Sequence, residues 1–187
     1  MKILLVNHGT ASEWGGGDGV QMRETAARLK QRGHSVEIQN NDTPHIGDSD
    51  LVHIFNCRVS NSFIKQVETC KAAGKPIVVS PIWINIARAL WGSRGTFGIL
   101  QKAIHQGEEF VEQELELLRT RKLKIELQQG SLDALGGGSY DLGWQTEVGR
   151  LLNSVEGLLP NSWLELKSVQ TDLNWCGDNF RIAHYGV

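Results

Sequence analysis

The sequence predicts an α/β domain built on a doubly wound, mostly parallel β-sheet flanked by helices. Short apolar runs at 2–6, 51–55 and 77–79 have the length and content of strands that are buried on both faces. Segments with helical spacing separate these runs, and strands that alternate with helices form βαβ units with parallel strands. A length of 187 residues suits one such domain with a core of its own.

The chain opens with a strand at 2–6, a glycine-containing loop at 8–17 and a helix at about 18–32. Three apolar residues lie on one stripe of this helix: Met22, Ala26 and Leu29. Gly33 ends the helix. Glycines that free backbone N–H groups at a helix start can bind phosphate, but they also serve as a plain connection, and both alternatives stay open. Neither the P-loop pattern nor Gly-x-Gly-x-x-Gly fits this loop.

The remaining elements are expected in the following order along the chain. They are a strand at 35–39, a helix at 60–73, a short helix at about 144–151, a strand at 155–159, a helix at 162–173 and a strand at 180–185. Three residues mark the buried stripe of the second helix: Phe63, Val67 and Cys70. No internal repeat and no linker divides the chain, so a single domain at 1–187 is expected.

Residues from about 82 to 145 form a helical and loop insertion in this domain. Helical spacing between 100 and 118 is interrupted by Gly107, and 123–127 fits either a helix end or a short strand. The loop up to Gly143 contains three consecutive glycines and is expected to be the most mobile part. The segment 86–94 fits either a peripheral membrane contact or a core helix with snorkelling arginines, and we favour the core helix.

Composition excludes several classes of protein. A net charge of −2 indicates no general affinity for nucleic acid. The three cysteines and six histidines show no spacing typical of a disulfide framework or a metal site, so no metal is expected. The first residues lead directly into a strand, and no run approaches the ~20 apolar residues that span a bilayer. A cytoplasmic protein is expected, at the inner face of the membrane if the 86–94 segment binds there.

In an open parallel sheet, ligands bind beyond the carboxyl ends of the strands. This rule selects six residues for the rim of a binding cleft: His8, Asp18, Asn56, Ser80, Trp83 and Asn161. Such a rim is polar and nearly uncharged, and it suits a hydroxyl-rich ligand better than a polyanion. His8 is the histidine best placed for chemistry, whereas His53 fits a core residue. Ser162 matches a capping box more closely than a ligand contact.

Seven segments of the chain resemble the glycosyltransferases of the GT-B fold, and most closely the large retaining family 4. These segments are 2–7 (KILLVN), 16–17 (GG), 27–36 (AxLKxRGHxV), 50–56 (DLVHIFN), 73–81 (AGKPIVVSP), 159–165 (LPNSWxE) and 185–187 (YGV). Their order and spacing are more specific than any one segment. The resemblance covers nearly the whole chain but only the first, Rossmann-like half of such an enzyme.

The resemblance implies that this chain is the acceptor-binding half of a glycosyltransferase and lacks the C-terminal donor-binding domain. It implies that Gly16 and Gly17 approach the diphosphate of a UDP- or GDP-linked sugar donor, without a metal, and that a glycan or lipid-linked glycan accepts the sugar. The region from Ser80 to Asn85 departs from the family pattern, so no catalytic residue is assigned. The chain alone is then expected to be inactive.

Two other interpretations remain. One is a non-enzymatic Rossmann-like module that binds carbohydrate or protein. The other, less favoured, is a nucleotide-dependent oxidoreductase. The second strand ends in Gln39 and Asn40 instead of the acidic residue that binds a ribose in those enzymes.

Overall fold

The computed structural model describes residues 1–11, 16–84 and 143–184. The chain divides into two units, one of which joins Met1–Trp83 to Gly143–Val187, while the other is Ile84–Leu142. This division falls close to the insertion predicted at about 82–145. The predictions for the insertion's interior, including its helices, its glycine loop and the 86–94 segment, lie outside the described residues.

The described strands form one sheet in which all pairs are parallel, in the order β2-β1-β3-β4-β5. The strands are β1 (Lys2–Asn7), β2 (Ser35–Asn40), β3 (Leu51–Phe55), β4 (Ile77–Ser80) and β5 (Gly157–Leu158). The helices of the described part are α2 (Gly17–Gln31), α3 (Ser60–Ala72), α8 (Gly143–Leu152) and α9 (Trp163–Leu173). The predicted α/β class with a parallel, helix-flanked sheet is confirmed.

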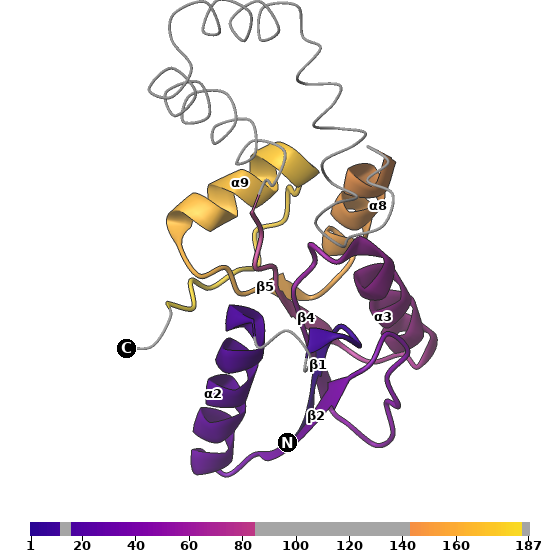
Figure 1. Cartoon of the computed structure of the whole chain (residues 1–187), viewed down its shortest axis with the longest axis vertical. Helices are drawn as coiled ribbons and strands as arrows, with labels where there is room; N and C mark the ends of the chain where they lie inside the picture. Colours follow the sequence, from indigo (N-terminus) through magenta and orange to yellow (C-terminus); the bar gives the residue numbers. More distant parts are fainter. Residues whose placement is uncertain (12–15, 85–142, 185–187) are drawn as a thin grey trace, which may run out of the picture. The chain divides into compact units, whose positions relative to one another are not determined.

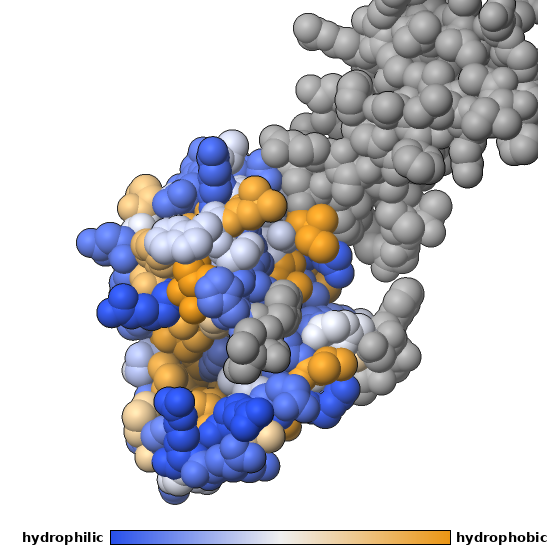
Figure 2. All heavy atoms as spheres, turned by 90° about the vertical axis from the view of Figure 1, so that its left-hand side faces the viewer, coloured by the Kyte–Doolittle hydropathy of each residue, from blue (hydrophilic) through white to orange (hydrophobic). Residues whose placement is uncertain are grey.

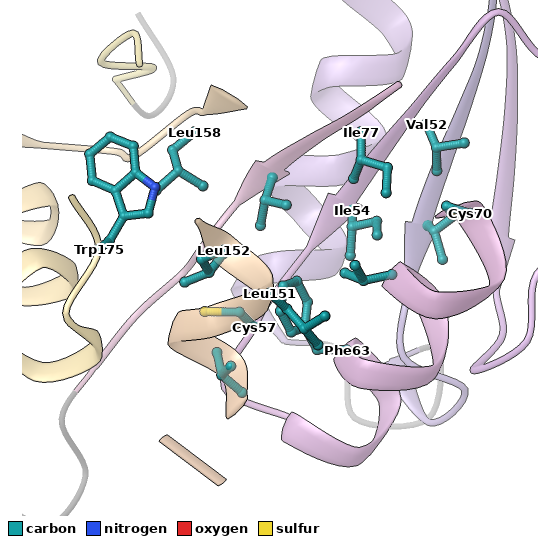
Figure 3. Packing of buried hydrophobic residues seen from close by; sticks show 14 of the residues in the cluster. Val52, Ile54, Cys57, Phe63, Cys70, Ile77, Leu151, Leu152, Leu158 and Trp175 are labelled. Atoms are coloured by element: carbon teal, nitrogen blue, oxygen red, sulfur yellow. The ribbon is translucent and has the colours of Figure 1, made fainter. Parts of the chain in front are cut away.

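The two faces of the sheet carry separate apolar clusters, because side chains alternate along each strand. On one face, Ile3 and Leu5 of β1 and Phe55 of β3 pack with Met22 and Ala26 of α2. On the other face, a larger cluster joins the alternate strand residues to side chains of α3, α8 and α9. Figure 3 shows this larger cluster, in which the labelled residues of α3 and α8 face those of β3 and β4. The predicted stripe of Phe63, Val67 and Cys70 is fully buried here.

Glycines end the first two described helices in the same way. Gly33 has φ +83° and Gly74 has φ +64°, a conformation that costs glycine little. After α2, the N–H of Gly33 donates to the carbonyl of Lys30 and that of His34 to Leu29. These two hydrogen bonds form a Schellman motif, which satisfies carbonyl groups that the helix end would otherwise leave unpaired.

The strands at the β5 edge are shorter than the sequence predicts. The strand predicted at 155–159 is only Gly157–Leu158, and the strand predicted at 180–185 is a single bridge between Phe180 and Leu158. Two backbone hydrogen bonds continue beyond the bridge. The N–H of Arg181 donates to the carbonyl of Leu158, and the N–H of Ala183 donates to the carbonyl of Pro160. Proline has no N–H to donate in return, so a regular ladder cannot extend past it. Residues 185–187 lie outside the described part.

Helices α8 and α9 meet at a close backbone contact. A Cβ on Gly149 of α8 would lie 2.0 Å from the carbonyl oxygen of Leu173, so only glycine fits. Asn153 bonds across the same junction, since its amide donates to the carbonyls of Gly149 (2.9 Å) and Asn174 (3.1 Å). The N–H of Cys176 in turn donates to Asn153 Oδ1 at 2.8 Å.

The surface on the α2 side is partly apolar. Figure 2 faces this side and shows hydrophilic residues over most of its lower part, with hydrophobic residues exposed above them. The exposed apolar residues of the described part include Val20 on α2 and Leu164 on α9. None of the helices in the described ranges is long and apolar enough to cross a membrane.

Candidate functional site

The candidate site lies where the direction of the strand order reverses. From β1 the chain passes through α2 to β2 at one side of the sheet, and from β3 it passes through α3 to β4 at the other. β1 and β3 are neighbours with Val6 opposite Ile54, so the residues that follow them emerge together. This is the position at which doubly wound sheets bind ligands.

Asp18, the second residue of α2, is the centre of the polar groups at this position. Its Oδ2 accepts hydrogen bonds from Asn56 Nδ2 at 2.9 Å, His8 Nε2 at 3.2 Å and Asn7 Nδ2 at 3.3 Å. Its Oδ1 accepts from the backbone N–H of Gly19 at 2.9 Å. We call Asn7, His8, Asp18 and Asn56 the Asp18 cluster. Three segments contribute to it: the end of β1, the end of β3 and the first turn of α2.

These donors determine the charge of Asp18. The hydrogen bond from His8 is the main reason that the pKa of Asp18 lies well below its usual range, and the bonds from Asn56, Gly19 and Asn7 act in the same direction. Burial opposes them, because it disfavours the charged form. The carboxylate is therefore ionised at neutral pH. Its side chain is only 10% exposed and that of His8 only 12%.

The loop after β1 is held in place by two side chains. His8 Nδ1 lies 2.9 Å from Thr10 Oγ1, so both ring nitrogens of His8 have a partner. The N–H of Gly9 donates to Asp42 Oδ1 at 2.9 Å. The loop is thus tied both to α2 and to the segment that follows β2, and His8 keeps a fixed orientation.

Asn56 owes its position to an uncommon backbone conformation. Its φ is +70°, a left-handed value that asparagine tolerates better than most residues. Its Oδ1 accepts the N–H of Arg58 at 3.2 Å, which is the hydrogen bond of an Asx turn. The turn leaves the Nδ2 group directed at Asp18.

Asn161 joins the site through α2. Its Oδ1 accepts a hydrogen bond from Gln21 Nε2 at 2.8 Å, and Gln21 lies one turn after Asp18 on the same helix. Asn161 is 8% exposed. The first turns of α2 therefore connect the Asp18 cluster to the exit of β5.

Ser80 and Trp83 lie in the interior instead of on an open rim. Ser80 is 1% exposed, and its hydroxyl lies 2.9 Å from Nε2 of His53. Burial lowers the pKa of His53 to about 3, so this histidine is neutral and is a core residue, as expected. The indole N–H of Trp83 donates to Asp172 Oδ2 at 3.0 Å. Both side chains are therefore buried and bonded within the domain, so they do not line an open rim.

Glu165 is a residue whose role the sequence did not reveal. Its carboxylate accepts the backbone N–H groups of Trp83 (2.7 Å) and Asn161, and so ties the exits of β4 and β5 to α9. Burial raises its pKa, while these hydrogen bonds oppose the rise. The expected capping bond is present, since Ser162 Oγ accepts the N–H of Glu165 at 3.1 Å. The capping pattern located Glu165 but neither its bond to the nearby Asn161 nor its bond to the distant Trp83.

A buried glutamine of α3 bonds to the backbone at the Asp18 cluster. Gln66 of α3 is 1% exposed, and its Nε2 donates to the carbonyls of Asn7 (2.9 Å) and Asn41 (3.0 Å). It lies beside Val67 in the buried stripe of α3. A polar residue in an otherwise apolar stripe was the sequence signal that could have identified it.

The two glycines predicted to approach a diphosphate differ from each other. A Cβ on Gly16 would lie 2.6 Å from Asp18 Oδ1, whereas a Cβ on Gly17 would have no atom within 4 Å. Within the described ranges, the N–H groups of Gly17 and Asp18 donate no hydrogen bond. The helix start therefore has N–H groups available, but the Asp18 carboxylate already lies beside them.

Comparisons with known proteins identify no family. No model of a protein family matches the sequence, and no curated protein matches it.

The arrangement is suited to neutral polar ligands. It combines amide, imidazole and hydroxyl groups around one carboxylate whose charge is already compensated by four donors. Within the described part of the chain, no group of three or more His, Cys, Asp or Glu side chains could hold a metal ion.

Replacing Asp18 with asparagine should lower the free energy of unfolding by about 2 kcal/mol at pH 7, because hydrogen bonds to an ionised group contribute about that amount. The folded protein holds the pKa of Asp18 below its unfolded value, so this stabilisation is present above pH ~4 and is lost as the pH falls further. Urea unfolding of both proteins at pH 7 and pH 3 measures the difference. The exposed Asp178→Asn serves as control, and an Asp18→Asn effect equally large at pH 3 would contradict the assignment.

Proposed function

We propose that this chain is the acceptor-binding half of a glycosyltransferase that uses a nucleotide sugar. The observation that carries the proposal is the Asp18 cluster at the switch point of the sheet. Amide and imidazole groups exchange hydrogen bonds with sugar hydroxyls, and the cluster contains no Lys or Arg that would bind a polyanion. Asn7 and Asn56 are buried, at 0% and 3% exposed, so His8 and Asp18 are the members that a ligand would reach first. The resemblance of the seven segments supports the same conclusion. The acceptor would be a glycan or a lipid-linked glycan.

In such an enzyme the donor, a UDP- or GDP-linked sugar, would be held mainly by a second domain. Gly17 would contribute a backbone N–H to the donor diphosphate, since its N–H has no partner within the described residues and no side chain blocks its approach. Catalysis would depend on positioning the two substrates and on stabilising the departing diphosphate.

One observation favours a non-enzymatic sugar-binding module instead. The ionised carboxylate of Asp18 lies at the start of α2, where it opposes the approach of a diphosphate to the same N–H groups. A module that binds only the hydroxyl-rich ligand would not encounter this repulsion.

The test begins with the gene beyond the codon for Val187. A second β/α domain there, together with sugar transfer by the complete protein from a panel of UDP- and GDP-linked sugars, would support the enzyme. Residues 1–187 alone should fold and give no turnover, and nucleotide should bind them with a Kd weaker than about 1 mM, or ~4 kcal/mol. Calorimetry that finds micromolar binding of UDP or GDP to residues 1–187 would contradict this division of labour. A stop codon combined with glycan binding would favour the module.

A further inference from the structure

Gln21 carries a hydrogen-bond acceptor that the fold does not use. Its Oε1 is buried, and within the described part of the chain it is the one buried side-chain nitrogen or oxygen atom without a hydrogen-bond partner. The other end of the same amide is bonded, since Nε2 donates to Asn161 Oδ1 at 2.8 Å. A buried acceptor that lacks a donor destabilises the folded protein, so this oxygen calls for an explanation.

The orientation of the Gln21 amide follows from Glu165. The carboxylate of Glu165 accepts the backbone N–H groups of Trp83 and Asn161. Burial raises the pKa of Glu165, and a hydrogen bond from the side-chain amide of Asn161 is among those that oppose the rise. The Asn161 group that faces the carboxylate is therefore Nδ2, which leaves Oδ1 for Gln21. A flipped Gln21 amide would place two oxygen atoms against each other, so Oε1 must point away from Asn161.

The surface around this amide is apolar. Gln21 as a whole is partly exposed although its Oε1 is buried, so the amide lies close to the surface. Its neighbour Val20 is 47% exposed, and Trp163 and Leu164 at the start of α9 are 66% and 75% exposed. The hydrogen bond between Gln21 and Asn161 brings these two segments together. A single polar atom among exposed apolar side chains is the combination that sites for small ligands show.

A sugar matches both parts of this surface. A hydroxyl group is neutral and donates one hydrogen bond, which is what a single amide oxygen needs, whereas an ammonium or guanidinium group brings more donors than this oxygen can accept. The C–H groups of a sugar ring pack against apolar and aromatic side chains. The indole of Trp163 already has a defined orientation, because it meets Phe180 edge to face with ring centres 5.6 Å apart and planes at 84°.

We propose that Gln21 Oε1 accepts a hydrogen bond from one hydroxyl group of the acceptor sugar, and that Asn161 and Glu165 are its positioning residues. This inference rests on the proposed function, which assigns acceptor binding to this chain. Gln21 then determines which sugars bind. An analogue without that hydroxyl group leaves the amide oxygen buried and unpaired, and a site of this kind rejects such an analogue.

The experiment measures by NMR how methyl glycosides bind to the 187-residue chain. The probes are the methyl glycosides of glucose, galactose and mannose, each with the monodeoxy analogues that lack one hydroxyl group. Wild type should bind one of these analogues about tenfold more weakly than its parent glycoside. The carbonyl carbon of the Gln21 side chain should shift with the parent glycoside and not with that analogue.

Three variants identify the atom responsible. Gln21→Met keeps nearly the same side-chain volume without the amide, and it should lose the discrimination at that one hydroxyl group while the discrimination at the others remains. Asn161→Ala frees the Gln21 amide to turn, so the discrimination should become smaller. Gln170→Met, at an exposed position of α9, is the matched control and should discriminate as wild type does. Circular dichroism establishes that each variant folds.

Two results would overturn the inference while leaving acceptor binding intact. One is a Gln21→Met variant that discriminates as wild type does, and the other is a Gln21 carbonyl carbon that no bound glycoside shifts. The second result is measured on wild type, so it does not depend on the folding of a variant. A chain that shows the expected discrimination but transfers no sugar in the complete protein would keep this inference and lose the enzyme. If no glycoside shifts any signal of the chain, acceptor binding fails and this inference fails with it.

Discussion

Replacing Gly149 with alanine should lower the free energy of unfolding by about 3 kcal/mol, near the upper end of the usual cost of overpacking. The added methyl would lie 2.0 Å from the carbonyl oxygen of Leu173, and this neighbour is backbone that cannot rotate away. Helices α8 and α9 would have to separate, which would also strain the two hydrogen bonds donated by Asn153. For a chain of this size the melting temperature should fall by roughly 6–12 °C.

Gly17→Ala is the matched control, because it adds the same methyl group within a helix where no atom lies within 4 Å. Its melting temperature should stay close to that of wild type. Circular dichroism melts of the three proteins give the comparison. Equal melting temperatures for wild type and Gly149→Ala would mean that the helices do not meet as closely as described.

For the glycosyltransferase proposed above, Gly17→Val should lower kcat/KM by roughly a hundred- to a thousand-fold, or about 3–4 kcal/mol, at an unchanged melting temperature. A diphosphate oxygen needs to come within ~2.9 Å of a backbone N–H, and two methyl groups on Cβ would block that approach. In the free protein a Cβ at Gly17 would have no atom of the described residues within 4 Å, and Gly17 does not have a positive φ. Loss of activity without loss of stability would thus identify a ligand contact.

Gly16→Val separates this effect from a structural one. A Cβ there would lie 2.6 Å from Asp18 Oδ1 and would displace the carboxylate, so activity and stability should fall together. Steady-state kinetics and thermal melts on the same preparations distinguish the two patterns. Activity near wild type in Gly17→Val would mean that this glycine only connects β1 to α2. The third glycine of the run, Gly15, lies outside the described residues.

Most of the fold could be predicted because its signals are local. The buried runs of β1, β3 and β4 and the apolar stripes of α2 and α3 follow directly from residue spacing, and Gly33 and Gly74 stop these helices where expected. The β5 edge could not be predicted as well. Whether 180–185 forms a strand depends on the hydrogen bonds of Leu158 and Pro160, which lie more than twenty residues earlier.

The structure brings together three of the residues selected for the candidate site, but their connections could not be predicted. The rule for parallel sheets selected His8, Asp18 and Asn56 for one edge of the sheet, yet it could not show that Asp18 bonds to the other two. The same rule also selected Ser80, whose hydroxyl bonds to His53 in the interior. The direction in which a side chain leaves the end of a strand depends on packing from distant segments, and periodicity does not contain that information.

The unequal apolar clusters on the two faces of the sheet have a consequence for local stability. Within the described part, the cluster on the α2 face has five buried residues and includes side chains from one helix. The opposite cluster includes side chains from three helices. Segments with fewer buried contacts open more often while the rest of the protein stays folded. Each opening of α2 would also withdraw Asp18 from His8 and Asn56. A ligand bound at this edge would therefore slow the amide hydrogen exchange of α2 more than that of β3, and occupancy of the site could be followed on a helix that borders it.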